Sequence, residues 1–331
     1  MDRINRAHGG GGTKMRSLIK DIFLENFKSP ELAKLNDYAA VTLPPGRVAL
    51  TTDSFVVDPW EFPGGNIGDL AVCGTVNDLA MSGATPLYLT TGFILPEGFP
   101  LGDLRKIVKA MALRAEEAGV AIVAGDTKVV EAGCGPFLNT AGVGVIPEGV
   151  EIAGENARPG DAVIITGVAG SHGIAVLSKR EGISFSTEIL SDAAPLCGIT
   201  RALLTGGALP HVLRDPTRGG VAEALNEIAS QSGVEIEIDD NLIPLEAGVR
   251  SACDLLGYDP LHVANEGCML VIIPGELKEK ALGIIRGCRY GERAEIIGEV
   301  RAGTPRVVAR TILGSRRLVD APAGELLPRI C

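Results

Sequence analysis

The sequence lacks the patterns that mark several common classes of protein. No apolar run approaches the ~20 residues of a membrane-spanning helix, and the first six residues have no apolar signal-peptide core. We therefore expect a cytoplasmic protein that has no contact with a membrane. The net charge is −10, and proteins that bind phosphate backbones normally carry a basic excess or patch. Nucleic acid is therefore not an expected partner.

Motifs for zinc, for disulfides and for a P-loop are also missing. The seven cysteines form an odd set without a C-x-x-C pair, and the histidines form no H-x-x-x-H pair. The Walker motif G-x-x-x-x-G-K-S/T is absent, which excludes an ordinary P-loop nucleotide site. Aromatic residues make up only 4% of a chain that is 46% hydrophobic, so its apolar content is mostly aliphatic. This composition is typical of an α/β protein.

The length of 331 residues is enough for two domains, each with its own core. Hydrophobic periodicity predicts an α/β (α+β) fold in which strands and helices follow one another in both halves. The predicted divisions are a glycine-rich segment with a helix (1–34), an N-terminal domain (35–150), a C-terminal domain (157–313) and a flexible tail (314–331). The predicted helices are 67–81, 101–118, one that follows the turn at residues 167–173, 192–205, 219–232, 244–256 and 274–285. The predicted strands are 47–53, 87–95, 120–124, 136–146, 161–167, 234–238 and 268–273, with two short ones near residues 296 and 308.

The last residue is a cysteine, Cys331. Glycine and proline recur from Gly314 onward and interrupt any regular structure. A fully extended tail would span roughly 55 Å, at about 3.3 Å per residue. A thiol at such a position can travel to a distant site, although an incidental terminal cysteine is the simpler alternative.

Four consecutive glycines, Gly9, Gly10, Gly11 and Gly12, stand close to Lys14 near the start of the chain. A run of this kind is neither helix nor strand, and it allows backbone N–H groups to approach a ligand such as phosphate closely. A flexible N-terminal linker would have the same composition, so the sequence leaves both interpretations open.

Four aspartates occur in similar settings, beside Gly, Thr or Asn at a strand end, in a turn or on a helix of small residues. They are Asp53, Asp78, Asp126 and Asp215. Each alone would be an ordinary turn or N-cap residue, but together they suit a magnesium and nucleotide site, because Mg²⁺ prefers hard oxygen ligands. Asn77, next to Asp78 on the predicted helix, is expected to face the same site.

A series of motifs resembles that of the PurM-like superfamily, which includes aminoimidazole ribonucleotide synthetase. The terminal Pro328-Arg329-Ile330-Cys331 narrows the resemblance to the HypE family of hydrogenase maturation factors, over nearly the whole chain. The motifs are His8 to Gly12, Thr52-Asp53-Ser54, Val76-Asn77-Asp78-Leu79-Ala80-Met81, Gly125-Asp126-Thr127-Lys128, Asp215-Pro216-Thr217-Arg218-Gly219-Gly220 and Ala264-Asn265-Glu266-Gly267.

This resemblance implies a two-domain enzyme that forms a homodimer through its N-terminal domain and binds ATP with Mg²⁺. It implies magnesium ligands at the four aspartates. The ATP-binding positions that it implies are Gly9, Gly10, Gly11, Gly12, Asp53, Asn77, Asp78, Asp126, Thr127 and Asp215.

The resemblance also implies the chemistry. The thiol of Cys331 would accept a carbamoyl group from the carbamoyltransferase HypF, and ATP-dependent dehydration would convert that group to a thiocyanate. The cyanide would then pass to iron on a HypC and HypD complex, as a ligand of nickel–iron hydrogenase. Similarity points to Glu266 as the base and to Lys128 as the positive charge near the phosphate. From the residues alone, Glu266 could equally be a turn residue and Lys128 a surface residue.

Two other functions remain open on the sequence. A small-molecule kinase of the same superfamily, such as selenophosphate synthetase or thiamine-monophosphate kinase, would use the aspartates but would not need a terminal cysteine. A non-catalytic scaffold that carries a modified thiol would use Cys331 but would leave the aspartates unexplained.

Overall fold

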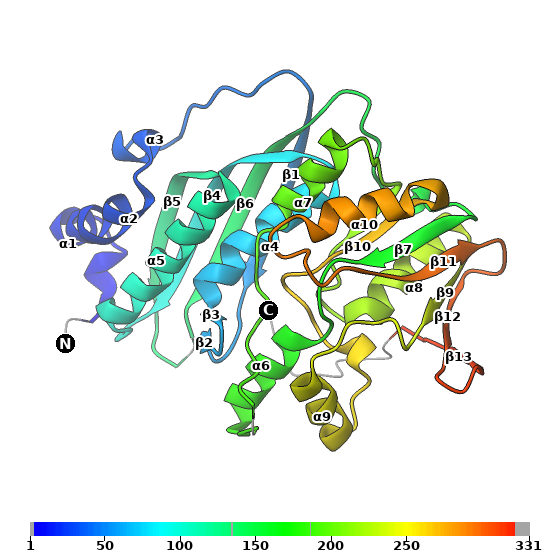
Figure 1. Ribbon diagram of the computed structural model, residues 1–331. Coiled ribbons are helices and arrows are strands. Elements are labelled where there is room, and N and C mark those ends of the chain that lie inside the picture. The colour runs from blue at the N-terminus through cyan, green and yellow to red at the C-terminus, as the bar shows by residue number, and fades with distance from the viewer. Residues whose placement is uncertain (1–2, 134, 186, 322–331) are drawn as a thin grey trace.

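Two α/β units, each built on its own sheet, make up the protein (Figure 1). The computed structural model describes residues 3–133, 135–185 and 187–321. The mixed α/β architecture with two units confirms the fold class that the sequence predicts. No helix in these ranges is long and apolar enough to cross a membrane.

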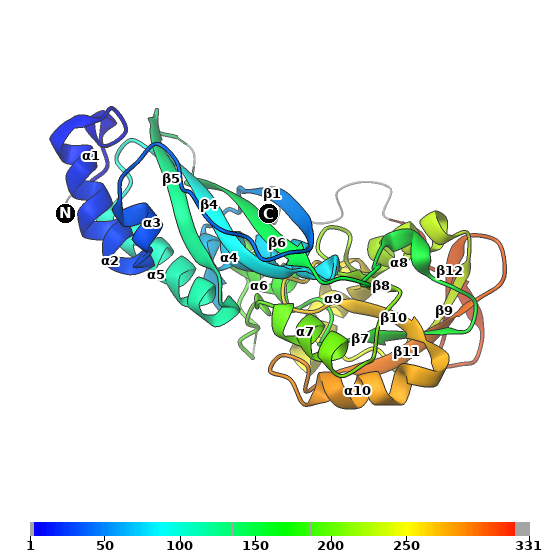
Figure 2. The same cartoon turned by 90° about the horizontal axis from the view of Figure 1, so that it is seen from above.

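The N-terminal unit is a four-stranded sheet with two long helices on one face (Figures 1 and 2). The strand order is β1 (Arg47–Phe55), β6 (Phe137–Ile146), β4 (Thr85–Pro96) and β5 (Ala121–Val130). The helices are α4 (Ile67–Met81) and α5 (Leu101–Ala118), with the bounds predicted from their periodicity. A two-stranded hairpin of β2 (Glu61–Phe62) and β3 (Gly65–Asn66) precedes α4 and is not evident from the sequence.

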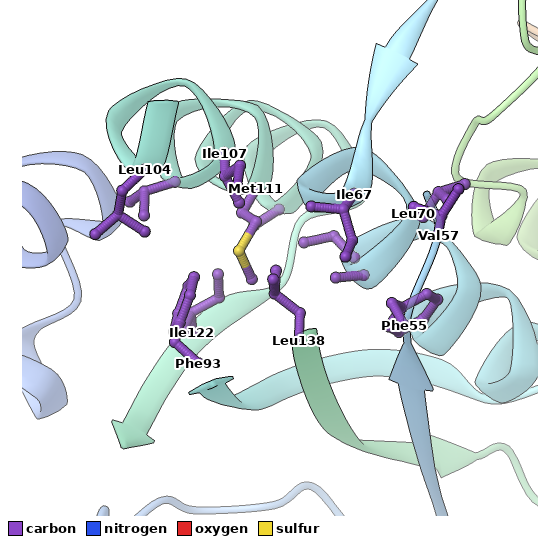
Figure 3. Close-up of a cluster of buried hydrophobic side chains, with 14 of the residues drawn as sticks. Phe55, Val57, Ile67, Leu70, Phe93, Leu104, Ile107, Met111, Ile122 and Leu138 are labelled. Carbon is purple, nitrogen blue, oxygen red and sulfur yellow. The ribbon is translucent and has the colours of Figure 1, made fainter. Parts of the chain in front are cut away.

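The core of this unit lies between the helices and the sheet (Figure 3). Ile107 and Met111 on α5 point toward Phe93 and Ile122 on the sheet. A Cβ atom at Gly68 of α4 would lie 2.4 Å from the carbonyl oxygen of Ile107, so only glycine permits this close approach of the two helices. The helix α4, which carries Asn77 and Asp78, therefore packs closely against α5.

The opposite face of the sheet has no helix over it within the described ranges (Figure 2). Its apolar side chains are exposed, including Val48 (49%), Leu50 (73%) and Ile94 (40%). Short helical segments lie instead beyond the β5 edge, as Figure 1 shows. They are η1 (Arg6–His8), α1 (Gly12–Leu18), the π-helical η2 (Ile19–Leu24), α2 (Glu25–Phe27) and α3 (Pro30–Ala33).

The C-terminal unit is a seven-stranded sheet in the order β13-β12-β9-β11-β7-β10-β8. One buried cluster joins α8 to one face, and another joins α7 and α10 to the opposite face. The strands are β7 (Asp161–Ile165), β8 (Val212–Arg214), β9 (Glu235–Asp239), β10 (Leu270–Pro274), β11 (Glu295–Arg301), β12 (Arg306–Arg310) and β13 (Arg316–Leu318). The helices are α6 (Ser171–Glu181), α7 (Cys197–Thr205), α8 (Gly220–Ser232), α9 (Ala247–Leu256) and α10 (Lys278–Arg286), with the short turns η3 (Gly154–Asn156), η4 (Pro260–His262) and η5 (Gly275–Leu277).

Several predicted boundaries in this unit are wrong. The helices predicted from residues 244 and 274 begin at Ala247 and Lys278. Two further differences concern the site and the tail. The helix predicted from residue 192 begins at Cys197, because Asp192 lies in irregular chain and its carboxylate accepts hydrogen bonds from a distant turn. The prediction of a flexible tail from Gly314 is wrong for its first residues, because β13 pairs with β12 and Val319 is buried. Cys331 and the residues from 322 onward lie outside the described ranges.

Candidate functional site

Three of the predicted aspartates interact electrostatically where the two units meet. Asp53 lies on β1, Asp78 on α4 and Asp215 directly after β8. The hydroxyl of Thr51 donates to Oδ2 of Asp78 at 2.7 Å, which orients Asp78 beside β1. Burial raises the pKa of Asp215 to about 7, and the negative charges of Asp78 and Asp53 add to this rise. The protein thus holds three carboxyl groups close enough to repel one another.

Two arginines partly offset this negative charge. Burial raises the pKa of Asp53 and the charge of Asp78 adds to the rise, whereas the charge of Arg218 opposes it. Arg214 and Arg218 also lower the pKa of Asp78, which burial raises. Arg214 forms an ion pair with Glu227 of α8. Arg218 is exposed in the loop that follows Asp215. Its positive charge is near enough to lower the pKa of Asp53 and Asp78.

Glu266 is a buried carboxyl group beside this cluster, with 4% of its surface exposed. Burial raises its pKa well above the ordinary value, and Asp192, Asp215 and the other aspartates of the cluster raise it further. This confirms the direction of the pKa shift expected for a proton acceptor. Its role as a base stays a prediction.

The side chain of Asn77, on α4 of the N-terminal unit, is hydrogen-bonded to backbone groups of the C-terminal unit. Its Nδ2 donates to the carbonyl oxygen of Ala194 at 3.0 Å and to that of Glu266 at 3.4 Å. Its Oδ1 accepts the N–H of Leu196 at 2.8 Å. The carboxamide of Asn77 is therefore already bonded to three backbone groups around Glu266, and nucleotide binding by this side chain stays a prediction.

Asp126 and Lys128 lie on β5, at the other edge of the N-terminal sheet from β1. Nζ of Lys128 pairs with Oδ2 of Asp126 at 2.7 Å, and both side chains are exposed. Between β1 and β5 lie β6 and β4, so about 14 Å separates the edge strands at ~4.8 Å per strand. One chain therefore does not bring Asp126 and Lys128 into the cluster of Asp53, Asp78 and Asp215. Thr127 points the other way and is buried against the helices.

The glycine-rich segment lies against the end of β5. A Cβ atom at Gly9 would lie 2.8 Å from the backbone nitrogen of Val129, so a glycine is needed for this approach. Gly11 and Gly12 have positive φ angles, and Gly12 is the first residue of α1, where neither helix nor strand was expected. The segment thus lies next to Lys128, and its contact with phosphate stays a prediction.

The sequence analysis missed Asp192 and the contacts of Asn265. The two oxygens of the Asp192 carboxylate accept the N–H groups of Glu266 and Gly267. Nδ2 of Asn265 donates to the carbonyl oxygen of Pro216 at 3.0 Å, which links the Glu266 turn to the Asp215 loop. Only the position of Asn265 within the Asn-Glu-Gly motif could have signalled such a role.

Metal-binding geometry is the last feature of the site. Among the described residues, no group of three or more His, Cys, Asp or Glu side chains is arranged to hold a metal ion. Asp53, Asp78 and Asp215 are hard oxygen donors of the kind that Mg²⁺ prefers. The donor type therefore fits magnesium, and the binding of the ion stays a prediction.

Two family models match the chain, one in each unit. The N-terminal domain of AIR synthase related proteins matches residues 36–146, and the C-terminal domain matches residues 158–309. Carbamoyl dehydratase HypE of Azotobacter vinelandii is 50% identical over 99% of this chain and 97% of its own length. The chain belongs to the HypE family.

Solved HypE structures agree with this assignment. The crystal structure of a hydrogenase maturation protein HypE in complex with ATP is 45% identical, with a TM-score of 0.94 over 98% of each chain. HypE in a crystal structure of a HypE–HypF complex is 51% identical, with a TM-score of 0.81 over 92% of this chain and all of that one. The kinase alternative is far more distant: thiamine-monophosphate kinase from Stenotrophomonas maltophilia is 18% identical, with a TM-score of 0.63 over 83% of this chain and 86% of that one, and it shares the fold alone.

Proposed function

We propose that this HypE-family chain uses ATP to dehydrate a carbamoyl group on the thiol of Cys331, which yields a thiocyanate. The observation that supports this most is the buried Glu266 carboxyl group of raised pKa beside the aspartate cluster. Conversion of the S-carbamoyl amide to a nitrile removes the amide oxygen and both protons of the nitrogen. Phosphoryl transfer from ATP to that oxygen lets it leave as phosphate, and a base must take the protons.

Glu266 suits the role of that base. A carboxylate surrounded by other negative charges binds a proton more tightly than an exposed glutamate, so its ionised form is a stronger base. Asp53, Asp78 and Asp215 would hold the magnesium ion, which would neutralise phosphate charge when bound. Their mutual repulsion in the free protein would be relieved by a cation, because each of them would then face positive charge.

The second half of the site would come from another copy of the chain. Asp126 and Lys128 lie at the far edge of the sheet from Asp53, while the open sheet face carries exposed apolar side chains such as Leu50. Packing of this face against the same face of a second copy would bury these side chains. It would also allow Lys128 and the glycine-rich segment of one chain to approach the aspartates of the other. The proposed enzyme is therefore a homodimer.

The remaining partners follow from the relatives. Structures named for HypE with ATP and for a HypE–HypF complex support ATP as the co-substrate and HypF as the carbamoyl donor. A HypC and HypD complex is the proposed acceptor of the cyanide. The proposed place of the reaction is the cytoplasm.

Replacement of Glu266 by glutamine tests the proposal. The Glu266→Gln variant should still accept a carbamoyl group on Cys331 and bind ATP, but conversion to thiocyanate should fall by at least about 100-fold, because general bases contribute roughly 10²–10⁴-fold. Mass spectrometry of the C-terminal peptide follows both steps. Glu235→Gln is the matched control, because Glu235 is another buried glutamate of the same unit that is ion-paired with Arg306 and Arg316. Wild-type conversion by Glu266→Gln would overturn the proposal.

A further inference from the structure

Asp192 lies in the irregular segment before α7 and is hydrogen-bonded to the turn that carries Glu266. Its Oδ1 accepts the backbone N–H of Glu266 at 3.1 Å, and its Oδ2 accepts that of Gly267 at 3.0 Å. Hydrogen bonds to a charged acceptor are stronger than neutral ones, so this carboxylate is well suited to fix the turn.

The turn can approach Asp192 this closely only because residue 267 is glycine. A Cβ atom at Gly267 would lie 1.7 Å from the carbonyl oxygen of Asp192. The backbone of Gly267 therefore packs directly on the backbone of Asp192. The glycine of the Asn-Glu-Gly motif is therefore explained by this backbone contact, independently of the chemistry of the glutamate before it.

The other side of the same turn is held from the N-terminal unit. Asn77 donates to the carbonyl oxygen of Glu266, and the N–H of Ala194 donates to that oxygen at 3.3 Å. The backbone of Glu266 is therefore bonded through both its N–H and its carbonyl oxygen. In contrast, within residues 3–133, 135–185 and 187–321 no donor is hydrogen-bonded to the carboxyl group of Glu266. The backbone of Glu266 is thus fixed, and its carboxyl group is free to accept a proton from a substrate.

We propose that Asp192 is a positioning residue that holds Glu266 in the geometry needed to take protons from the carbamoyl nitrogen. This inference rests on the proposed function and adds a residue that acts through Glu266 without touching the substrate. Because misplacement of a catalytic group by about 1 Å can cost roughly 100-fold in rate, a change at Asp192 should slow the chemical step.

The test is the Asp192→Asn variant, which keeps the shape but replaces one acceptor oxygen by an NH₂ group. That group cannot accept the N–H of Gly267 or of Glu266. Starting from protein already carbamoylated on Cys331, single-turnover conversion to thiocyanate should be about 10- to 100-fold slower. The dissociation constant for ATP should stay near that of the wild type, whereas the unfolding temperature should fall by some degrees because one backbone N–H loses its acceptor. A role in stability alone would lower the unfolding temperature and leave the single-turnover rate of folded protein unchanged, and that result would overturn the proposal.

Asp161→Asn is the matched control. Asp161 also accepts a backbone N–H, that of Arg158, and it pairs with His211. Asp161 is the first residue of β7 and pairs with Pro274, the last residue of β10. The Glu266 turn precedes Leu270, at the opposite end of β10, so Asp161 lies far from that turn along the strand pair. Asp161→Asn should therefore convert carbamoyl to thiocyanate at the wild-type rate, and an equal loss in both variants would overturn the specific role of Asp192.

Hydrogen exchange in the wild-type protein tests the same idea without a variant. The amides of Glu266 and Gly267 should exchange slowly in the folded protein, because both are bonded to Asp192. Fast exchange of both amides would overturn the proposal even if Asp192→Asn did not fold. The Glu266→Gln result remains separate: unimpaired conversion by that variant would refute the proposed base, whereas a loss in Glu266→Gln without a loss in Asp192→Asn would refute only the positioning role.

Discussion

Replacement of Asp215 by asparagine should stabilise the free protein, and the gain should grow with pH. Burial raises the pKa of Asp215 from the ordinary 3.8 to about 7, and Asp78 and Asp53 add to the rise. The folded state therefore binds this proton more tightly than the unfolded state does. The stability that the protonated group contributes is present below about pH 4 and is lost as the pH rises toward about 7. Asparagine has no such proton to lose.

The magnitude follows from the shift. Between about pH 5 and about pH 7 the folded wild type loses about 1.4 kcal/mol of unfolding free energy per pH unit from this group, so the upper limit is about 3 kcal/mol. For a protein unit of this size, 1 kcal/mol corresponds to about 2–4 °C in unfolding temperature. The stability gain of Asp215→Asn over the wild type should therefore be larger at about pH 8 than at about pH 5, by up to about 6–12 °C.

Thermal unfolding of the nucleotide-free protein at both pH values measures this difference. Asp126→Asn is the control, because Asp126 is exposed and ion-paired with Lys128 rather than part of the cluster. It should show no gain that depends on pH. An Asp215→Asn variant whose stability relative to the wild type is the same at both pH values, or falls as the pH rises, would refute the reasoning about this carboxyl group.

Three further predictions follow from the site and the open sheet face. Asp78→Asn should weaken magnesium–ATP binding by about 10- to 100-fold, because it removes a charged contact worth about 1.5–3 kcal/mol, and unchanged binding in calorimetry would exclude Asp78 from the site. Leu50→Glu should convert the proposed dimer to a monomer, and an unchanged mass in solution by light scattering would place the interface elsewhere. Magnesium–ATP should slow the alkylation of Cys331 in a variant whose other cysteines are replaced, because we expect nucleotide to bind the state with the tail in the site more tightly than the state with the tail outside. Equal alkylation rates with and without nucleotide would refute the idea that nucleotide draws the tail into the site.

Regular elements were predictable because their patterns are local. The helices α4 and α5 have the predicted bounds, since apolar residues recur at helical spacing and glycines follow both helices at Gly83 and Gly119. The strand β13 escaped prediction because only three residues pair with β12, and glycine and proline on either side suggested a tail.

The candidate site was predictable in its residue types but not in its arrangement. Asp53, Asp78 and Asp215 come together as the sequence suggested, whereas Asp126 lies at the far edge of the sheet because strand order is not encoded locally. The proposed role of Asp192 depends on a contact with a turn more than 70 residues away. No periodicity or motif around Asp192 indicates that contact.

The central claim, dehydration of a carbamoyl group on Cys331, is tested most directly by mass spectrometry of the C-terminal peptide. The protein would be incubated with the carbamoyl donor, first without and then with magnesium–ATP. We predict that the peptide gains the mass of a carbamoyl group on Cys331, that ATP converts this to the mass of a cyano group, and that Cys331→Ala gains neither. Carbamoyl loading of Cys331→Ala to the wild-type level, or formation of the cyano group without ATP, would contradict the account.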